Sequence, residues 1–479
     1  MKRRTTLLLS SAVTIAALFS FNSKVQATAD PTIKATNYNM IVKLDTRKNQ
    51  LTEKVTMHVV NNGNEPVRNL LVRNIASGVL KYDHKNFEAT RNATTSVKSI
   101  SSDGQKLSYT TGKDKSNLFV NKSLNTGEST DLTVNVVTGV PKRQDRFGYQ
   151  NINGGKVYNL SFCFPYLSDY RNGKWNYHPY YDAGENRNSA VSNFHVSFFA
   201  PKSYKVAASN KFKVDHAYAN GVRINDYYLA SKNSKQYNKL ALMTAQDSFH
   251  IFTKKIGKYP YKEIDITEGL LGKDTGGMEY PGLIMIDASG FLQKKHPLDR
   301  YNELTEDVSH EVGHQWFYGT VGSDEYMEPW LDEGLTNLLE NGVYDLTYTK
   351  SKSYCAKLMH SKFYTRKNVK RANKILKENT NQFINKNQKA NYINYPVNNP
   401  PKGVDTEDMA YELGMDFPAV LKVAMGENKF FDALQDYYQT YYLKQATTQD
   451  FLNIIRKYDN SKKVNNVINK FIDPKYLSE

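Results

Sequence analysis

The 479-residue sequence is poor in cysteine, with only Cys163 and Cys355. Two cysteines allow at most one disulfide, which excludes a cystine-rich scaffold, and free buried thiols are the simpler expectation. Glycine (27 residues) and proline (15 residues) are also sparse, so the composition excludes collagen-like and wholly disordered chains. The chain is longer than one hydrophobic core usually supports, and two domains are therefore expected.

Long apolar runs are missing after the first 27 residues, so no later segment is predicted to cross a bilayer. At the N-terminus, three basic residues at positions 2–4 precede an apolar segment from Leu7 to Phe21, and Val25-Gln26-Ala27 has the small residues of a cleavage site. This order predicts a secretory signal peptide over residues 1–27. The alternative, an uncleaved membrane anchor, is disfavoured because the segment is short and contains several polar residues. We therefore expect a secreted, extracellular protein.

Acidic residues are too few to balance the basic ones, and the formal charge is +16. Removal of residues 1–27 takes away four basic side chains and leaves 16 − 4 = +12. Such a charge favours association with anionic polymers of a cell wall or with an anionic membrane surface. The densest basic stretch, from Lys362 to Lys377, is equally typical of a solvated helix face. No nucleic-acid recognition motif is present, so nucleic acid is not expected as a partner.

Two patterns of hydrophobicity divide the chain. Within residues 28–205, apolar and polar residues alternate with a period of two in segments such as 40–44, 55–59 and 132–136, which predicts an antiparallel β domain. An aromatic-rich segment at 166–188 is expected to be a loop at the edge of that domain.

Residues 206–479 are predicted to form a second, mostly helical domain with a small sheet. The expected elements are helices at 236–256, 303–318, 329–345, 406–425 and 429–441, a strand at 263–267 and a loop at 379–403.

The strongest chemical signal is the H-E-x-x-H motif formed by residues 310–314. On a helix, His310 and His314 share one face and can bind the same metal ion, while Glu311 is placed to contact a metal-bound water. Hydrolytic zinc sites need a third protein ligand and leave a fourth position for water. Glu333 fits this role, since 18 residues separate it from His314 and a helix that folds back would bring it over the histidines. We therefore predict one zinc ion per chain, with Glu311 as the general base.

These residues resemble the aminopeptidase N family of gluzincin metallopeptidases. Gln315-Trp316-Phe317 and the segment 330–334 (W-L-D-E-G) match the family's signature, and two further elements occur in the family's order. The segment 276–280 (G-G-M-E-Y) is similar to the family's G-x-M-E-N, with tyrosine as the last residue. The segment 411–414 (Y-E-L-G) is similar to its Y-E-K-G, with leucine in place of lysine.

The resemblance implies an α+β chain of two domains: an N-terminal antiparallel β-sandwich-like domain followed by a thermolysin-like, mostly helical catalytic domain. We place their boundary at residue 205. Many relatives continue into a large helical domain that covers the active site, and the sequence after the catalytic domain is too short to form one.

The resemblance also assigns roles to the remaining motif residues. Tyr411 is expected to donate a hydrogen bond to the developing oxyanion, and Glu279 to pair with the free α-ammonium group of a peptide. Gly276, Gly277 and Met278 would belong to the strand along which the substrate binds. Separately, Asn337, one turn after Glu333, is expected to hydrogen-bond a ligand histidine.

The predicted activity is hydrolysis of N-terminal residues from peptides with free N-termini. Two alternatives stay open. A zinc endopeptidase of thermolysin type shares the H-E-x-x-H motif and a downstream glutamate. A non-catalytic cell-wall-binding protein that keeps the fold would have no need of the base Glu311.

Overall fold

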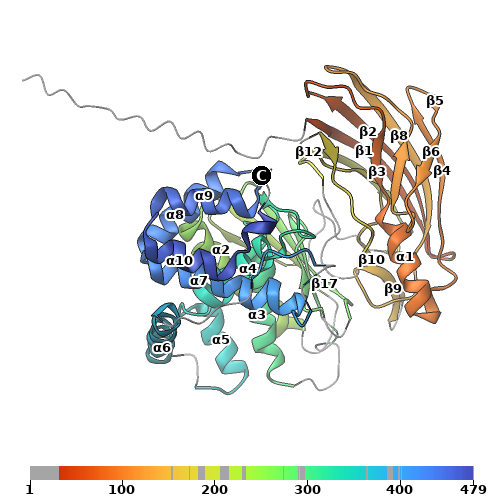
Figure 1. Cartoon of the computed structure of the whole chain (residues 1–479). Helices are drawn as coiled ribbons and strands as arrows, with labels where there is room; N and C mark the ends of the chain where they lie inside the picture. The colour runs from red at the N-terminus through yellow and green to blue at the C-terminus, as the bar shows by residue number, and fades with distance from the viewer. Residues whose placement is uncertain are drawn as a thin grey trace, which may run out of the picture.

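The computed structural model describes residues 32–477 except 153–154, 172, 182–188, 205–214, 229–233, 273–274, 288, 290, 292–296, 363–364, 386–391, 398–399 and 401. The signal peptide predicted over residues 1–27 lies outside the described residues. A β-rich part and a mostly helical part lie side by side (Figure 1). This division follows the change in hydrophobic pattern that the sequence shows.

The N-terminal part is built on a large sheet with strand order β13-β12-β1-β2-β8-β4-β5 and with β14 parallel to β1. In the central strands, alternate side chains are buried, as the period of two predicts. The strands are β1 (Ile33–Asp45), β2 (Gln50–Asn61), β4 (Thr95–Ser102), β5 (Gln105–Lys106), β8 (Ser129–Gly139), β12 (Tyr170–Arg171), β13 (Lys174–Trp175) and β14 (Asn193–Phe199).

A second sheet with order β11-β3-β7-β6 completes the hydrophobic core of this part. It consists of β3 (Leu70–Arg73), β6 (Tyr109–Thr111), β7 (Asn117–Val120) and β11 (Tyr166–Leu167). The same part of the chain also contains α1 (Ile75–Asn86) and a separate hairpin of β9 (Phe147–Ile152) and β10 (Gly155–Leu160). The prediction of a loop over 166–188 is wrong for its first half, because β11, β12 and β13 pair there with the two sheets. Their length of two residues each is too short to produce an alternating pattern.

The helical part contains a mixed sheet of order β15-β16-β17-β19-β18, in which β18 is an edge strand. Its strands are β15 (Asp215–Ala219), β16 (Val222–Tyr227), β17 (Glu263–Gly269), β18 (Gly277–Met278) and β19 (Leu283–Asp287). The long helices α2 (Ser234–Lys255) and α3 (Arg300–Gly313) pack against each other, and α3 also contacts β18 and β19. The edge strand therefore lies directly beside the helix that carries the metal motif.

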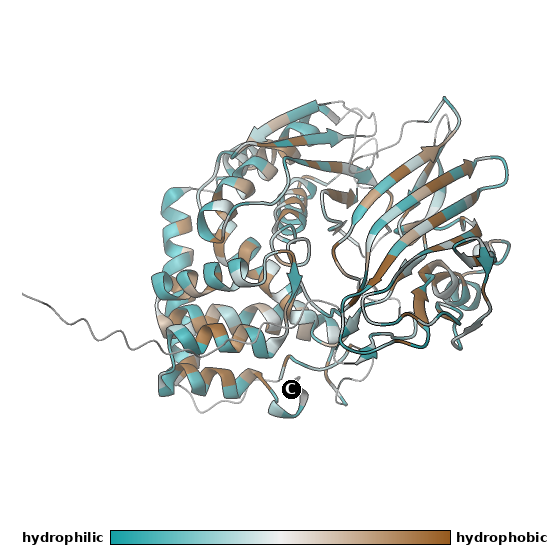
Figure 2. Cartoon of the chain, turned by 90° about the horizontal axis from the view of Figure 1, so that it is seen from above, coloured by the Kyte–Doolittle hydropathy of each residue, from teal (hydrophilic) through white to brown (hydrophobic). Residues whose placement is uncertain are grey.

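The remaining helices contribute buried apolar residues to one hydrophobic core. Along these helices, brown apolar residues alternate with teal hydrophilic ones (Figure 2). The helices are α4 (Glu333–Leu339), α5 (Lys350–Leu358), α6 (Arg366–Asn385), α7 (Leu413–Met425), α8 (Glu427–Thr440), α9 (Thr448–Tyr458) and α10 (Lys462–Phe471), and a short parallel pair joins β20 (Val321–Gly322) to β21 (Lys444–Gln445). Two predicted bounds are wrong: α3 ends at Gly313 rather than at 318, and α6 continues to Asn385 into the expected loop.

Three further expectations concern the surface and the thiols. Cys163 and Cys355 are not joined in a disulfide, and of the two only Cys355 is fully buried. Helix α6 places most of its side chains, including the basic ones, on the surface, as expected of a solvated helix face. Among the described helices, none combines the length and the apolarity that crossing a membrane requires.

Candidate active site

Helix α3 brings the two histidines of the H-E-x-x-H motif together at its C-terminal end. His314 follows the last residue of α3 but keeps helical dihedral angles (φ −59°, ψ −18°), so it stays on the same face as His310. Their Nε2 atoms lie 2.9 Å apart. The predicted pair of imidazole ligands is therefore formed within one helical turn.

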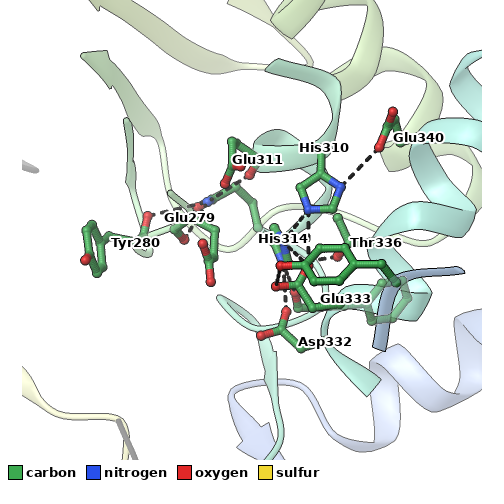
Figure 3. A network of polar contacts seen from close by, with 12 residues as sticks. Glu279, Tyr280, His310, Glu311, His314, Asp332, Glu333, Thr336 and Glu340 are labelled. Carbon is green, nitrogen blue, oxygen red and sulfur yellow. Dashed lines mark hydrogen bonds and ion pairs between the residues drawn. The ribbon is translucent and has the colours of Figure 1, made fainter. Parts of the chain in front are cut away.

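Glu333, the first residue of α4, supplies the third donor atom. Its Oε2 lies 3.2 Å from His310 Nε2 and 3.3 Å from His314 Nε2 (Figure 3). Metal–ligand bonds of about 2.0–2.1 Å at tetrahedral angles place neighbouring ligand atoms about 3.3 Å apart. The three donor atoms thus have the spacing of one face of a zinc coordination tetrahedron.

The charges around the histidines also favour a cation. Burial alone would disfavour the protonated imidazole, but the Glu333 and Glu340 carboxylates outweigh it and raise the pKa of His310 to about 10. The pKa of His314 is likewise raised well above its usual value, against burial, by Asp332 and Glu333. A site that stabilises positive charge on both rings fits a divalent metal ion held between neutral imidazoles.

Each histidine is oriented by a second carboxylate on its other nitrogen. His310 Nδ1 lies 3.1 Å from Glu340 Oε2, and His314 Nδ1 lies 2.6 Å from Asp332 Oδ1. Such contacts fix the tautomer and direct Nε2 toward the metal. The prediction for Asn337 is wrong: its Nδ2 donates to the Tyr411 carbonyl oxygen at 3.1 Å instead.

Glu311 lies beside this ligand set, deeply buried, with 5% of its surface exposed. Its Oε2 has no hydrogen-bond partner among the described residues although the side chain lines a cavity. Burial raises the pKa of Glu311 to about 8. A buried carboxylate with an unused oxygen beside three metal donors is the arrangement that a general base requires.

Gly277 explains how Glu311 fits against the edge strand β18. A Cβ atom at this position would lie 2.4 Å from Glu311 Oε1, so any other residue would displace the carboxylate. Gly276 is similarly close to Asp307, with a Cβ–Oδ1 distance of 2.5 Å. The two glycines, predicted as part of a substrate strand, therefore also make room for acidic side chains of α3. Met278 lines the same cavity and belongs to a small hydrophobic cluster with Leu271 and Met285.

Glu279 follows β18 and lines the same cavity. It is held by Gln315, the residue after the metal motif, whose Nε2 donates to the Glu279 carbonyl oxygen at 3.3 Å and whose Oε1 accepts from Gly282 N at 3.0 Å. Donor atoms of Glu279, Glu311 and His314 all lie within 4.8 Å of one another. The structure thus brings the predicted amine-binding carboxylate next to the metal site.

Tyr411 lies in the short π-helix Asp408–Glu412, directly before α7. Its hydroxyl donates a hydrogen bond of 2.5 Å to Glu333 Oε1. Although 37% of the residue's surface is exposed, desolvation of the phenol beside the metal ligands and the Glu333 carboxylate hold its pKa well above its usual range, so Tyr411 stays a proton donor. The predicted catalytic tyrosine is therefore in place at the metal ligands.

All these residues line one cavity of about 850 Å³. Its far wall includes Arg143, Asp145 and Arg146 from the N-terminal part, so the cavity lies between the two parts of the chain. Asn159 of β10 donates hydrogen bonds to the carbonyl oxygens of Asp145 at 2.7 Å and Leu270 at 3.2 Å, which ties that wall to the catalytic part.

Sequence reasoning missed several of these residues. Asp332 is the chain neighbour of the ligand Glu333, and Glu340 lies two helical turns after Glu333. Adjacency was therefore a signal for Asp332, and helical spacing was one for Glu340. Asp307 lies one turn before Glu311 on the same helix face, which was a comparable signal. Arg143 gave no such signal, because only the tertiary fold brings it to the cavity.

Comparison with known proteins agrees with this geometry. Residues 240–471 match the peptidase family M1 domain. The chain is 25% identical over 198 residues to aminopeptidase Q from Felis catus, a match that covers 40% of this chain and 18% of that relative. It is 24% identical over 241 residues to endoplasmic reticulum aminopeptidase 1 from Mus musculus, covering 49% of this chain and 23% of that relative. The chain thus spans less than a quarter of the length of these curated relatives.

Among solved structures, the M1 zinc metallopeptidase from Deinococcus radiodurans is similar, with a TM-score of 0.58 at 14% identity over 93% of this chain and 95% of that chain. The fold prediction, a β-sandwich-like domain before a helical catalytic domain, is therefore confirmed. Residues 240–471 thus match a domain of peptidase family M1, the aminopeptidase N family, and the chain has the fold of an M1 zinc metallopeptidase. Zinc is the metal of this family and fits the three donor atoms described above, which confirms the predicted cofactor.

Proposed function

We propose that the chain is a zinc aminopeptidase, which removes N-terminal residues from peptides. The observation that carries the proposal is the position of Glu279, whose carboxylate lies within 4.8 Å of donor atoms of Glu311 and His314. A carboxylate so close to the metal site leaves room for a single residue between the group that binds the α-amine and the bond that is cut.

Covalent geometry supports this reading. In a peptide, the α-nitrogen and the carbonyl carbon of the first residue are joined through one Cα, by bonds of about 1.46 and 1.52 Å. An ammonium group paired with Glu279 therefore places the first carbonyl group beside Glu311. Carbonyl groups further along an extended chain would lie beyond the base.

When bound, zinc polarises the scissile carbonyl group and lowers the pKa of the attacking water. The residues of this chain supply the remaining steps. Glu311 accepts a proton from the water as it attacks and delivers a proton to the departing amine. The phenol of Tyr411, already 2.5 Å from Glu333 Oε1, donates to the oxygen on which negative charge develops.

Two kinds of comparison support the substrate class. The curated relatives that match the chain are named as aminopeptidases. A mutant of the Deinococcus radiodurans protein, with a TM-score of 0.55 to this chain, has been solved with a Tyr-Ser-Ala substrate. Short peptides with free N-termini are accordingly the proposed substrates here.

The test compares a free peptide with its N-acetylated form. Wild-type, zinc-loaded protein should release the first residue of Tyr-Ser-Ala and leave acetyl-Tyr-Ser-Ala nearly uncut. Glu279→Gln should lower kcat/KM for the free peptide roughly 100-fold, because an ion pair in a partly dry cavity is lost, and should retain zinc. Glu263→Gln, a change in the same sheet away from the cavity, is the matched control and should behave as wild type. Internal cleavage of blocked peptides at the rate of free ones would show a thermolysin-type endopeptidase instead.

We also propose that the mature protein is secreted and associates with an anionic cell wall or membrane surface. The signal-peptide pattern of residues 1–27 and the net charge of +12 after its removal support this. The N-terminal sequence of the extracellular protein tests cleavage, which is expected after Ala27. Elution from isolated cell walls by moderate salt tests the electrostatic contact, and retention at high salt would contradict it.

A further inference from the structure

The order of residues along the cavity wall defines the direction of a bound peptide. Glu279 directly follows the edge strand β18, Gly277 is the first residue of that strand and adjoins the base Glu311, and Gly276 directly precedes it. If the α-amine binds at Glu279, the scissile bond lies at Glu311, and the second residue of the peptide lies beyond it, beside Gly276. This direction rests on the proposed aminopeptidase function.

Asp307 faces that end of the cavity. It lies four residues before Glu311, on the same face of α3 and about 6 Å along the helix axis. Its Oδ1 would lie 2.5 Å from a Cβ at position 276, so glycine there leaves room for the carboxylate. Within the described part of the chain, no group is hydrogen-bonded to this carboxylate, although it lines the cavity.

The surroundings of Asp307 are strongly acidic. Twelve of the 26 described residues that line the cavity are Asp or Glu, and two are Arg. Both arginines are already paired, Arg143 with Asp83 and Asp145, and Arg146 with Asp145 at 3.8 Å. Burial and the nearby Glu340 carboxylate raise the pKa of Asp307 to about 7, and a neighbouring cation would favour its ionised form.

We propose that Asp307 selects peptides with lysine or arginine as their second residue. The flexible stem of a lysine or arginine side chain would extend from the peptide backbone past Gly276, and its charged end would form an ion pair with the Asp307 carboxylate. An acidic second residue would instead add a negative charge to an already acidic wall. The preference concerns the residue that becomes the N-terminus of the product, so successive cuts would be fastest before basic residues.

The experiment compares three tripeptides with the same first and last residues: Ala-Lys-Ala, Ala-Ala-Ala and Ala-Glu-Ala. With zinc-loaded wild-type protein, kcat/KM should be roughly 10-fold higher for the lysine peptide than for the alanine peptide, and lowest for the glutamate peptide. Asp307→Asn should bring the lysine-to-alanine ratio close to one. Asp307→Glu keeps the charge and should keep the order of the three substrates.

Glu303→Gln is the matched control, because it removes a carboxylate one turn earlier on α3 that is paired with Arg300 and does not line the cavity. Its lysine-to-alanine ratio should equal that of wild type. Equal rates of wild-type protein on the lysine and glutamate peptides would overturn the proposal, as would an unchanged ratio in Asp307→Asn. The outcome separates the two proposals. If all three peptides are cut with equal kcat/KM, only the role of Asp307 is contradicted. If none of the three is cut, the aminopeptidase function itself is contradicted.

Discussion

The hydroxyl group of Tyr411 donates a 2.5 Å hydrogen bond to Oε1 of Glu333, whose other oxygen faces both histidines. One carboxylate thus joins the metal-binding atoms to the phenol. The contact links the first turn of α4 to the π-helix before α7, two elements that lie far apart in sequence. It places a proton donor at the edge of the metal site.

Tyr411→Phe keeps the ring and removes only the hydroxyl group. We expect kcat to fall by about 100-fold or more with little change in KM, because the lost donor acts mainly in the transition state. Zinc content should stay at the wild-type level. Steady-state kinetics on Tyr-Ser-Ala provide the measurement, and a near-normal kcat in zinc-loaded protein would remove Tyr411 from the mechanism.

Asp332→Asn should weaken zinc binding about 10–100-fold, since the carboxylate that orients His314 is lost while the three donors remain. Competition with a chelator of known affinity measures the effect. Asn337→Ala is the control on the same helix, because Asn337 contacts the Tyr411 backbone and neither histidine. Equal zinc affinity in the two variants would show that Asp332 does not orient the ligand.

Gly334 lets α4 and α7 approach at their first turns. A Cβ at Gly334 would lie 2.5 Å from the carbonyl carbon and oxygen of Gly414, so the two backbones would have to separate. Gly334→Ala should destabilise the protein by about 1–3 kcal/mol and lower its melting temperature and zinc affinity together. Gly155→Ala, where a Cβ meets no atom within 4 Å, should leave both unchanged. A wild-type melting temperature for Gly334→Ala would contradict this close approach.

Glu53 gives the N-terminal part a pH-dependent stability. Its side chain is buried in the β1–β2–β8 sheet, and burial raises the pKa of its carboxyl group from 4.5 to about 8. The folded state then keeps a proton that the unfolded state loses, so this contribution to stability falls as pH rises from 4.5 to 8. Glu53→Gln should be more stable than wild type by about 2–4 kcal/mol at pH 8 and equal to it near pH 4.5.

Thermal unfolding at several pH values measures this difference. The exposed Glu65 of the same domain provides the control, because Glu65→Gln should show no gain that grows with pH. A constant difference between Glu53→Gln and wild type across the range would mean that Glu53 is ionised in the folded protein.

Motif residues were predictable because their spacing is local. His310, Glu311 and His314 lie within about one helical turn, and Glu333 is the fourth residue of the segment 330–334 (W-L-D-E-G). The strands at 40–44, 55–59 and 132–136 were predictable for the same reason, since one face of each is buried. In both cases, the spacing of residues close together in the sequence indicates which side chains face the interior of the folded protein.

Other features depend on tertiary contacts that no local pattern encodes. Helical spacing made Asn337 a plausible hydrogen-bond partner of a histidine. In the folded chain, the segment 411–414 lies close to Asn337, whose side chain donates to the Tyr411 carbonyl oxygen instead. The two-residue strands β11 to β13 form only because neighbouring strands pair with them. Arg143 reaches the cavity through the packing of the two parts of the chain.

The most direct test of the account is the zinc content and turnover of three proteins measured side by side. Wild-type protein should hold about one zinc per chain and cleave Tyr-Ser-Ala, Glu333→Ala should lose both zinc and activity, and Glu311→Gln should hold zinc without turnover. That separation of metal binding from catalysis follows from three donor atoms about 3 Å apart beside a buried carboxylate with an unused oxygen. Full activity in metal-free wild-type protein, or wild-type turnover by Glu311→Gln, would contradict it.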